Sequence, residues 1–223
     1  MDVKKRTAIL LGATGLTGSY LLKMLLEDKR YGTIKLFSRS SVNIQHSKLR
    51  EYLGDILHLE NFGHEFFADE VYCCIGTTKS KTPDVERYKQ IDHGIPVTAA
   101  TLCVKNNIPT FIVVSALGAD TKSSIFYNRI KGHMEEDVLA LHITNTYILE
   151  PSMIGGERKE RRTGEWIAKQ LFKIFNGILT GPLKKYRSIH PETIAKAMIW
   201  VANNEYSNPR IPSDEITRLA AYK

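Results

Sequence analysis

Residues 12–18 of this 223-residue chain read Gly-Ala-Thr-Gly-Leu-Thr-Gly and decide its fold. They follow directly on residues 7–11 (TAILL), a nearly continuous apolar run typical of a parallel strand buried on both faces. Residues 16–27 come next, and their apolar positions repeat with the period of an amphipathic helix. A strand, a glycine-rich turn and a helix in this order predict the first unit of a Rossmann-type α/β fold.

The glycines and the start of the helix also suit the binding of phosphate groups. Gly12 permits a tight turn, Gly15 lets the backbone approach a pyrophosphate, and Gly18 allows the helix to lie close to the sheet. The first helical turn offers N–H groups and a partial positive charge to an anion. The spacing is Gly-x-x-Gly-x-x-Gly rather than the commoner Gly-x-Gly-x-x-Gly. The prediction therefore depends on the strand and helix that flank the loop.

The rest of the chain alternates strand-like and helix-like segments. Strands are predicted at residues 33–37, 52–56, 71–75, 108–114 and 146–149, and helices at residues 125–141, 165–179 and 191–202. A long helical stretch opens at Pro83 and runs towards Asn106, with a kink expected at Pro96. Ser213 is expected to cap a last short helix.

This alternation predicts the architecture of the whole chain. Strands that alternate with helices imply right-handed crossovers and a doubly wound, mostly parallel sheet with helices on both faces. The length suits a single domain over residues 1–223. Within it, residues 152–190 and 205–223 are expected to form a small C-terminal lobe on the substrate side of the sheet.

Composition narrows the class of protein. Hydrophobic content of 43% and charged content of 25% are ordinary for a globular domain and exclude disorder. The net charge of +7 is compatible with nucleic acid, a membrane surface or an anionic cofactor. No helix-turn-helix, zinc-finger or aromatic RNA-binding pattern is present, so we expect no nucleic-acid partner. The three cysteines have no metal-ligand spacing, so we expect no metal site.

Cysteine usage and the apolar runs bear on the compartment. Cys73 and Cys74 adjoin an apolar run and Cys103 stands alone, which favours buried thiols in a reducing compartment. The N-terminal apolar run is too short for a signal-peptide core or a transmembrane helix. We therefore expect a cytosolic protein.

The end of the second predicted strand indicates which dinucleotide would bind. A free ribose 2′-hydroxyl is usually met by an acidic residue there, whereas a 2′-phosphate needs a cation. This chain has Arg39 and no acid, so we expect NADP(H). Asp55 could accept from the adenine amino group, Ile56 could pack on the ring, and Gly76 leaves room for the ribose and phosphate.

Tyr127 and Lys131 are four residues apart on a predicted helix and therefore face the same way. A tyrosine with an ordinary pKa of about 10 exchanges protons poorly near neutral pH. A nearby ammonium group favours the phenolate and lowers that pKa. Ser115, at the end of the preceding strand, could polarise the same substrate oxygen. The three residues predict a centre for proton transfer to or from a carbonyl or alcohol.

Several segments together resemble the atypical branch of the short-chain dehydrogenase/reductase superfamily, and within it the Tat-interacting-protein-like oxidoreductases. The resemblance covers nearly the whole chain in the right order. The matching segments are the glycine loop, residues 73–78 (CCIGTT), 115–119 (SALGA), 127–131, 164–166 and 189–195.

The resemblance implies an NADP(H)-binding Rossmann domain with Ser115, Tyr127 and Lys131 in the catalytic positions. It also implies a set of cofactor contacts, to which Lys131 and Pro151 belong, together with Gly12, Thr14, Gly15, Leu16, Thr17, Gly18, Arg39, Gly76 and Thr77. Two positions depart from the family pattern. Asp92 stands where many members have an asparagine of the proton relay, and Glu150 precedes Pro151 where extended members often have arginine.

Three functions agree with these residues. The first is an NADPH-dependent oxidoreductase that acts on a small carbonyl or alcohol. The second is an NADP(H)-binding regulatory protein with little or no turnover, which the replacement at Asp92 favours. The third, a nucleotide-sugar epimerase or dehydratase, fits less well because the C-terminal lobe leaves little room for a large substrate.

Three further features have structural interpretations. His190 precedes a helix and is expected to cap it or pack there, although it could touch a substrate. The basic residues 158–162 either hold an anionic substrate or are solvated. The apolar face of residues 165–179 is expected to pack on the domain or on a second subunit, so a homodimer is possible.

Overall fold

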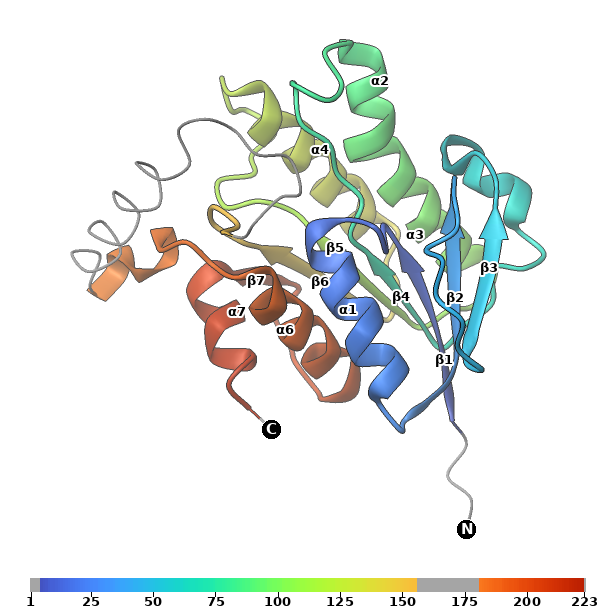
Figure 1. Ribbon diagram of the computed structural model, residues 1–223. Coiled ribbons are helices and arrows are strands. Elements are labelled where there is room, and N and C mark those ends of the chain that lie inside the picture. The colour runs from blue at the N-terminus through green and yellow to red at the C-terminus, as the bar shows by residue number, and fades with distance from the viewer. Residues whose placement is uncertain (1–4, 156–180, 223) are drawn as a thin grey trace.

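The computed structural model describes residues 5–155 and 181–222 of the chain. Within these residues, the strands form one parallel sheet in the order β3-β2-β1-β4-β5-β6-β7 (Figure 1). Their bounds are β1 (Arg6–Leu11), β2 (Tyr31–Ser38), β3 (Leu49–Leu53), β4 (Glu70–Cys73), β5 (Thr110–Val114), β6 (Asn145–Glu150) and β7 (Arg210–Pro212). The order reverses between β1 and β4, so the predicted doubly wound Rossmann sheet is confirmed.

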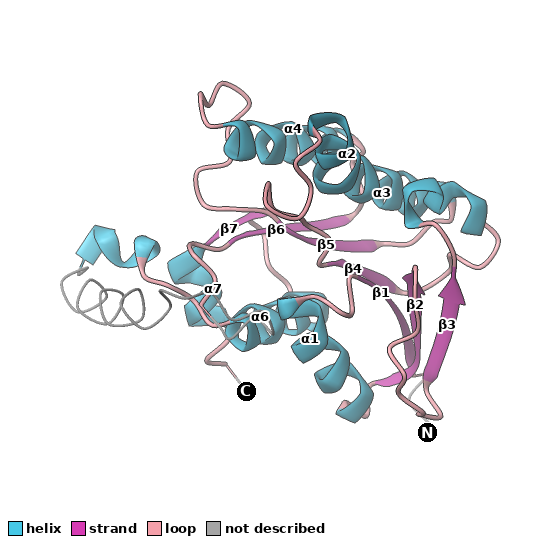
Figure 2. Ribbon diagram, turned by 45° about the horizontal axis from the view of Figure 1, so that its top comes forward, coloured by secondary structure: helices cyan, strands magenta, loops and turns pink. Residues whose placement is uncertain are grey.

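Helices cover both faces of this sheet, as Figure 2 shows. One layer consists of α1 (Leu16–Glu27), α6 (Pro191–Asn203) and α7 (Ser213–Leu219). The opposite layer consists of α2 (Val85–Lys89), α3 (Ile95–Lys105) and α4 (Phe126–Ala140). None of the helices in the described residues combines the length and the apolar character that crossing a membrane requires.

The core explains why the first strand is apolar at almost every position. Side chains of a strand alternate between the faces of the sheet. Ala8 and Leu10 of β1 belong to the buried cluster that includes residues of α1 and α6, whereas Ile9 and Leu11 belong to the cluster on the opposite face. Because helices cover both faces of the sheet, the side chains of β1 that point to either face must be apolar.

The long helical stretch is continuous from α2 to α3 and contains one wider turn. Residues 90–94 form a π-helical turn, in which the N–H of Ile95 bonds to the carbonyl of Gln90. Pro96, where a kink was expected, lacks the N–H that would bond to the carbonyl of Asp92 in a regular α-helix, and the π-helical turn lies directly before it. This turn places Asp92 in the interior, where its side chain is 1% exposed.

Sequence and structure differ most at short elements. The third strand ends at Leu53, not at Ile56, and a 3-10 helix (Ile56–Phe62) follows. The three-residue strand β7 was not predicted, since so short a segment has no recognisable period. Ser213 is the first residue of α7, and Pro212 is its N-cap, so the predicted cap is wrong by one residue. The hydroxyl of buried Ser213 instead donates to Ser152 Oγ at 3.1 Å.

The C-terminal segments lie against the sheet. Residues 205–222 contribute β7, which pairs with β6, and α7. Ile154 and Ile189 form a parallel bridge, which brings the described ends of residues 152–190 together beside α6. The basic residues 158–162 and the predicted helix 165–179 lie outside the described residues.

Candidate active site

A cavity of about 1280 Å³ lies at the carboxyl edge of the sheet, where the strand order reverses. Its walls come from one side of α1 along its whole length, the loop after β2, the segment after β4, the end of β5, the first turns of α4 and the start of α6. In open α/β sheets, ligands bind at this switch point. The volume exceeds the roughly 300–1,000 Å³ of ordinary small-molecule sites and suits a dinucleotide beside a small second ligand.

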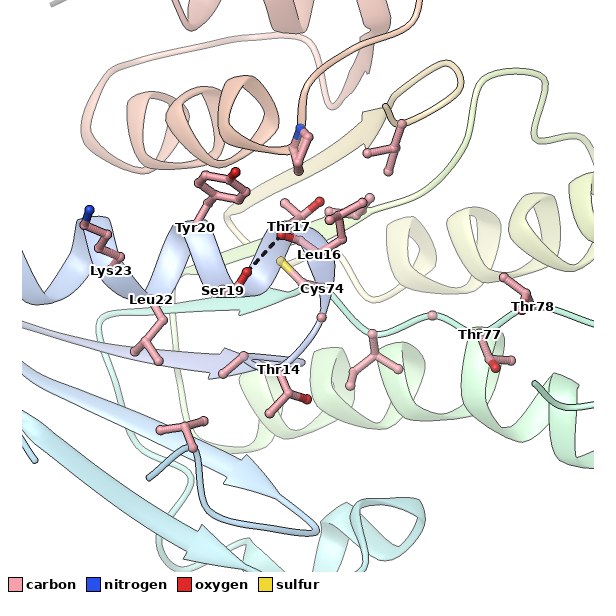
Figure 3. Close-up of a pocket in the computed structure, with 18 of the residues that line it drawn as sticks. Thr14, Leu16, Thr17, Ser19, Tyr20, Leu22, Lys23, Cys74, Thr77 and Thr78 are labelled. Carbon is pink, nitrogen blue, oxygen red and sulfur yellow. Dashed lines mark hydrogen bonds between the residues drawn. The ribbon is translucent and has the colours of Figure 1, made fainter. Parts of the chain in front are cut away.

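Most of the residues predicted from the sequence come together in this cavity. Figure 3 shows Thr14, Leu16 and Thr17 around the start of α1, and Thr77 on the segment that follows β4. The predicted residues that line the cavity are Thr14, Gly15, Leu16, Thr17, Gly76, Thr77, Ser115, Tyr127 and Lys131. The loop after β1, the segment after β4 and helix α4 therefore meet at this cavity, as the sequence predicts.

Gly12 and Gly18 shape the cavity without lining it. Gly12 has a φ of +85°, and a Cβ there would lie 2.7 Å from the carbonyl oxygen of Cys74. At Gly18, a Cβ would lie 2.1 Å from the carbonyl oxygen of Gly12. Either side chain would push α1 away from the strands, so this packing requires glycine at both positions, and their contacts with a cofactor stay predictions.

Four other predicted cofactor residues also lie outside the cavity wall. Arg39 is exposed just after β2. Asp55 caps the 3-10 helix by accepting from the N–H of Leu57 at 3.1 Å, and Ile56 packs in the core. Pro151 is buried, and its carbonyl accepts from the N–H of Leu117 at 2.9 Å. Their contacts with a cofactor stay predictions, because each side chain has a structural role or faces solvent in this structure.

The sequence did not indicate several residues that line the same cavity. The loop after β2 contributes Ser41 and Val42, which are held by the Glu51 carboxylate through bonds of 2.7 and 2.8 Å. On the other side, Tyr20 of α1 packs edge-on against His190, with ring centroids 5.4 Å apart. His190 also accepts from the N–H of Glu192 through Nδ1, which confirms the predicted capping role. No sequence motif marks Tyr20, Ser41 or Val42, because they meet only through tertiary packing, whereas His190 lies in the matching segment 189–195.

Tyr127 and Lys131 occupy one face of α4, as their spacing predicts. Tyr127 is 38% exposed in the first turn of the helix, at the cavity wall. Lys131 is 2% exposed, and its Nζ lies 3.2 Å from Asp92 Oδ1 and 3.4 Å from the carbonyl oxygen of Val114. Burial alone would lower the pKa of Lys131, but Asp92 and the phenol of Tyr127 raise it above its ordinary value. The lysine therefore carries its charge next to the tyrosine.

Asp92 connects this charge to the segment after β4. Its Oδ2 accepts from the N–H of Thr77 at 2.7 Å, while Oδ1 faces Lys131. Oδ1 receives no aligned hydrogen bond from the described part of the chain, so the ammonium charge of Lys131 balances it. The residue that departs from the family pattern is thus a buried partner of the lysine.

Ser115 lines the cavity and also has a buried partner. Its hydroxyl donates to Glu135 Oε1 at 2.5 Å, and its role at a substrate oxygen stays a prediction. Glu135 is 1% exposed, and its Oε2 accepts from Arg210 Nε at 2.9 Å. Arg210 Nε also lies 3.8 Å from Glu150 Oε1. Burial and the carboxylate of Glu135 raise the pKa of Glu150 to about 7, although Arg210 opposes the shift.

Comparisons with solved structures support the fold. The chain superposes on a UDP-N-acetylglucosamine 4-epimerase from Methanobrevibacter ruminantium with a TM-score of 0.69 at 19% identity, covering 94% of this chain and 76% of the epimerase. It superposes on vestitone reductase from alfalfa with a TM-score of 0.64 at 19% identity, covering 93% and 76% of the two chains. At these identities the likeness extends to the fold alone.

Sequence relatives point to the same superfamily and correct one prediction. The chain is 33% identical to "Protein FMP52, mitochondrial" of Meyerozyma guilliermondii, over 87% of this chain and 84% of the relative. It is 26% identical to "Protein HTATIP2" of Rattus norvegicus, over 88% and 81%. This agrees with the resemblance to the Tat-interacting-protein-like oxidoreductases. The expected cytosolic location is wrong, because the fungal relatives are named mitochondrial. The short N-terminal apolar run argued only against a signal peptide and a transmembrane helix, and it carried no information on mitochondria.

Residues 8–210 match the family model described as "NAD dependent epimerase/dehydratase family". The match begins within β1, ends at the first residue of β7 and includes every residue that lines the cavity. The chain belongs to the NAD dependent epimerase/dehydratase family.

Proposed function

We propose that this chain is an NADP(H)-dependent oxidoreductase that transfers a hydride to or from a small carbonyl or alcohol compound. The observation that carries the proposal is the placement of Lys131, buried and charged, beside Tyr127 at the wall of the cavity. A phenol next to a fixed ammonium group can give up and regain a proton near neutral pH. A cavity of dinucleotide size with a proton-transfer residue on its wall fits hydride transfer.

Each residue of the site has a separate role in the proposed reaction. NADP(H), when bound, supplies or accepts the hydride at its nicotinamide ring. Tyr127 gives its proton to the carbonyl oxygen as the carbon accepts the hydride, and takes it back in the reverse direction. Lys131 stabilises the phenolate that remains, and Asp92 holds the ammonium group in place. The start of α1 receives the pyrophosphate, since its first-turn N–H groups lack intrahelical partners.

The preference for NADP(H) rests on Arg39. Arg39 follows β2 at the carboxyl edge, where the adenosine ribose lies in Rossmann folds, and its side chain is exposed there. A guanidinium group can hold a 2′-phosphate through two parallel hydrogen bonds. No carboxylate follows β2 directly to bind a free 2′-hydroxyl instead.

A second function is favoured by two contacts at the same site. Asp92 neutralises part of the charge that Lys131 would exert on Tyr127, and Glu135 takes the hydroxyl proton of Ser115. Both weaken the catalytic set relative to the expectation from the sequence. They favour an NADP(H)-binding regulatory protein in which turnover is slow or absent.

Transfer of an isotopic label separates the two functions. The protein is incubated with NADPH deuterated at the transferable position and with a panel of aliphatic and aromatic aldehydes and ketones. An oxidoreductase places deuterium on the carbinol carbon of at least one product, which mass spectrometry detects. Binding of NADPH without label in any alcohol would instead support the regulatory function.

A further inference from the structure

The connection between β2 and β3 forms part of the cavity wall and has an unusual structure. Residues 39–48 join these two parallel strands, and they contain no helix. Parallel strands usually need a crossover of a dozen or more residues, most often an α-helix. The connection begins with exposed Arg39, and Ser41 and Val42 are among its residues that line the cavity. Without a helix, contacts with neighbouring elements must fix its conformation.

Glu51 of β3 holds the start of this connection through two hydrogen bonds. Its Oε2 accepts from Ser41 Oγ at 2.7 Å, and its Oε1 accepts from the N–H of Val42 at 2.8 Å. Ser41 Oγ in turn accepts from the N–H of Asn43 at 3.0 Å. Val42 also packs against the buried cluster that includes residues of α1. The chain is therefore anchored two residues beyond Arg39.

Arg39 lies between two fixed points of the backbone. On one side, Ser38 is the last residue of β2, and its hydroxyl donates to the carbonyl of Ser40 at 2.9 Å. On the other side, Glu51 fixes Ser41. Ordering a residue's backbone costs conformational entropy, and a binding residue that is already ordered does not incur this cost when its ligand arrives. The hydrogen bonds of Glu51 therefore favour any ligand that the guanidinium group binds.

We propose that Glu51 is a positioning residue for the adenosine phosphate of NADP(H), because it orders the connection that presents Arg39. This inference rests on the proposed function for the identity of the cofactor, and it names a residue that determines cofactor specificity. The negative charge of Glu51 would by itself repel a 2′-phosphate, although salt screens such repulsion over about 8 Å at physiological ionic strength. Ordering and repulsion therefore predict effects of opposite sign when Glu51 is removed.

Two substitutions at Glu51 separate ordering from charge. Glu51→Ala removes both hydrogen bonds and should weaken NADPH binding about tenfold, whereas the loss of a repelling charge would strengthen it. Glu51→Gln removes the charge but keeps an oxygen that can accept from the N–H of Val42. Its NADPH affinity should therefore stay within about threefold of wild type. NADH has no 2′-phosphate, so its affinity should be the same in all three proteins.

A double variant tests whether Glu51 acts through Arg39. In Arg39→Ala the guanidinium group is absent, so adding Glu51→Ala should change NADPH affinity little if the two residues act as a unit. The matched control is Glu60→Ala. This exposed acid lies on the 3-10 helix after β3, pairs with His58 and does not line the cavity. The control should bind both nucleotides as wild type does.

Calorimetric titration of each purified protein with NADPH and NADH gives the dissociation constants, and thermal melting shows whether each variant is folded. The inference is overturned if Glu51→Ala is folded and binds NADPH as tightly as wild type, or more tightly. It is also overturned if the tenfold loss persists in the Arg39→Ala background. Should Glu51→Ala not fold, Ser41→Ala removes one of the two hydrogen bonds and should weaken NADPH binding, and unchanged affinity there has the same meaning.

Failure of the proposed function gives different results. A wild type that binds neither nucleotide, or binds both equally, contradicts the cofactor of the proposed function, and the inference falls with it. Absence of label transfer alongside a preference for NADPH contradicts hydride transfer alone, because the titrations measure binding and need no turnover.

Discussion

Replacing Tyr127 with phenylalanine is expected to lower kcat for any carbonyl substrate by about 10²–10⁴-fold, the usual contribution of a positioned acid or base. The substitution removes one oxygen from an exposed ring at the cavity wall and leaves the packing of α4 unchanged. NADPH affinity should therefore stay close to that of wild type. The matched control is Tyr222→Phe near the C-terminus, where an exposed tyrosine contacts Arg218 and does not line the cavity.

Steady-state kinetics with separate determination of kcat and KM checks this expectation. A fall in kcat with unchanged nucleotide affinity places the loss in the chemical step. Full turnover by Tyr127→Phe would remove the tyrosine from the reaction. The substrate oxygen would then need another proton carrier at the cavity wall.

Replacing Lys131 with methionine is expected to destabilise the fold as well as the reaction. Asp92 is 1% exposed, and Lys131 is the cation that balances its Oδ1. Removing one partner of a buried ion pair typically costs about 3–5 kcal/mol, because the remaining charge stays buried without compensation. At roughly 2–4 °C per kcal/mol for a chain of this size, the melting temperature should fall by about 10 °C.

The double variant Asp92→Asn with Lys131→Met isolates the cause. An asparagine oxygen can still accept from the N–H of Thr77, and no buried charge remains. Calorimetric melting should show that the double variant recovers most of the lost stability while remaining inactive. If both variants melted at the same reduced temperature, the loss would come from packing around the lysine and not from the charge on Asp92.

Much of the fold could be predicted from the sequence because the relevant signals are local. The apolar run of β1, the glycine loop and the period of α1 place three adjacent elements without any distant contact. Helix α1 has the predicted bounds, and β1, β2, β4, β5 and β6 begin and end within two residues of their predicted bounds. Strand β3 is displaced from its predicted bounds by three residues at each end. The short strand β7 was missed because it depends on pairing with the distant strand β6. The 3-10 helix was missed because its first residue, Ile56, was assigned to the preceding strand.

For the site as well, the residues that could be predicted are those that depend on local signals. Tyr127 and Lys131 could be predicted because one helix holds both, and helical spacing fixes their shared face. Glu135 extends that face by another four residues, so the same spacing could have revealed it as a buried acid. Its partner Arg210 is 75 residues away on a strand too short to detect. Asp92 was recognised as unusual, but its pairing with Lys131 depends on the π-helical turn, for which no motif exists.

The central claim is that the cavity holds NADP(H), and calorimetric titration with NADPH and NADH tests it most directly. Wild type should bind NADPH at least tenfold more tightly than NADH, a difference of about 1.4 kcal/mol. Arg39→Ala should lose this preference and keep its affinity for NADH, whereas the control Arg50→Ala, an exposed arginine on β3, should behave as wild type. Equal binding of both nucleotides that Arg39→Ala leaves unchanged would contradict the assignment of the phosphate site, and binding of neither would contradict the claim as a whole.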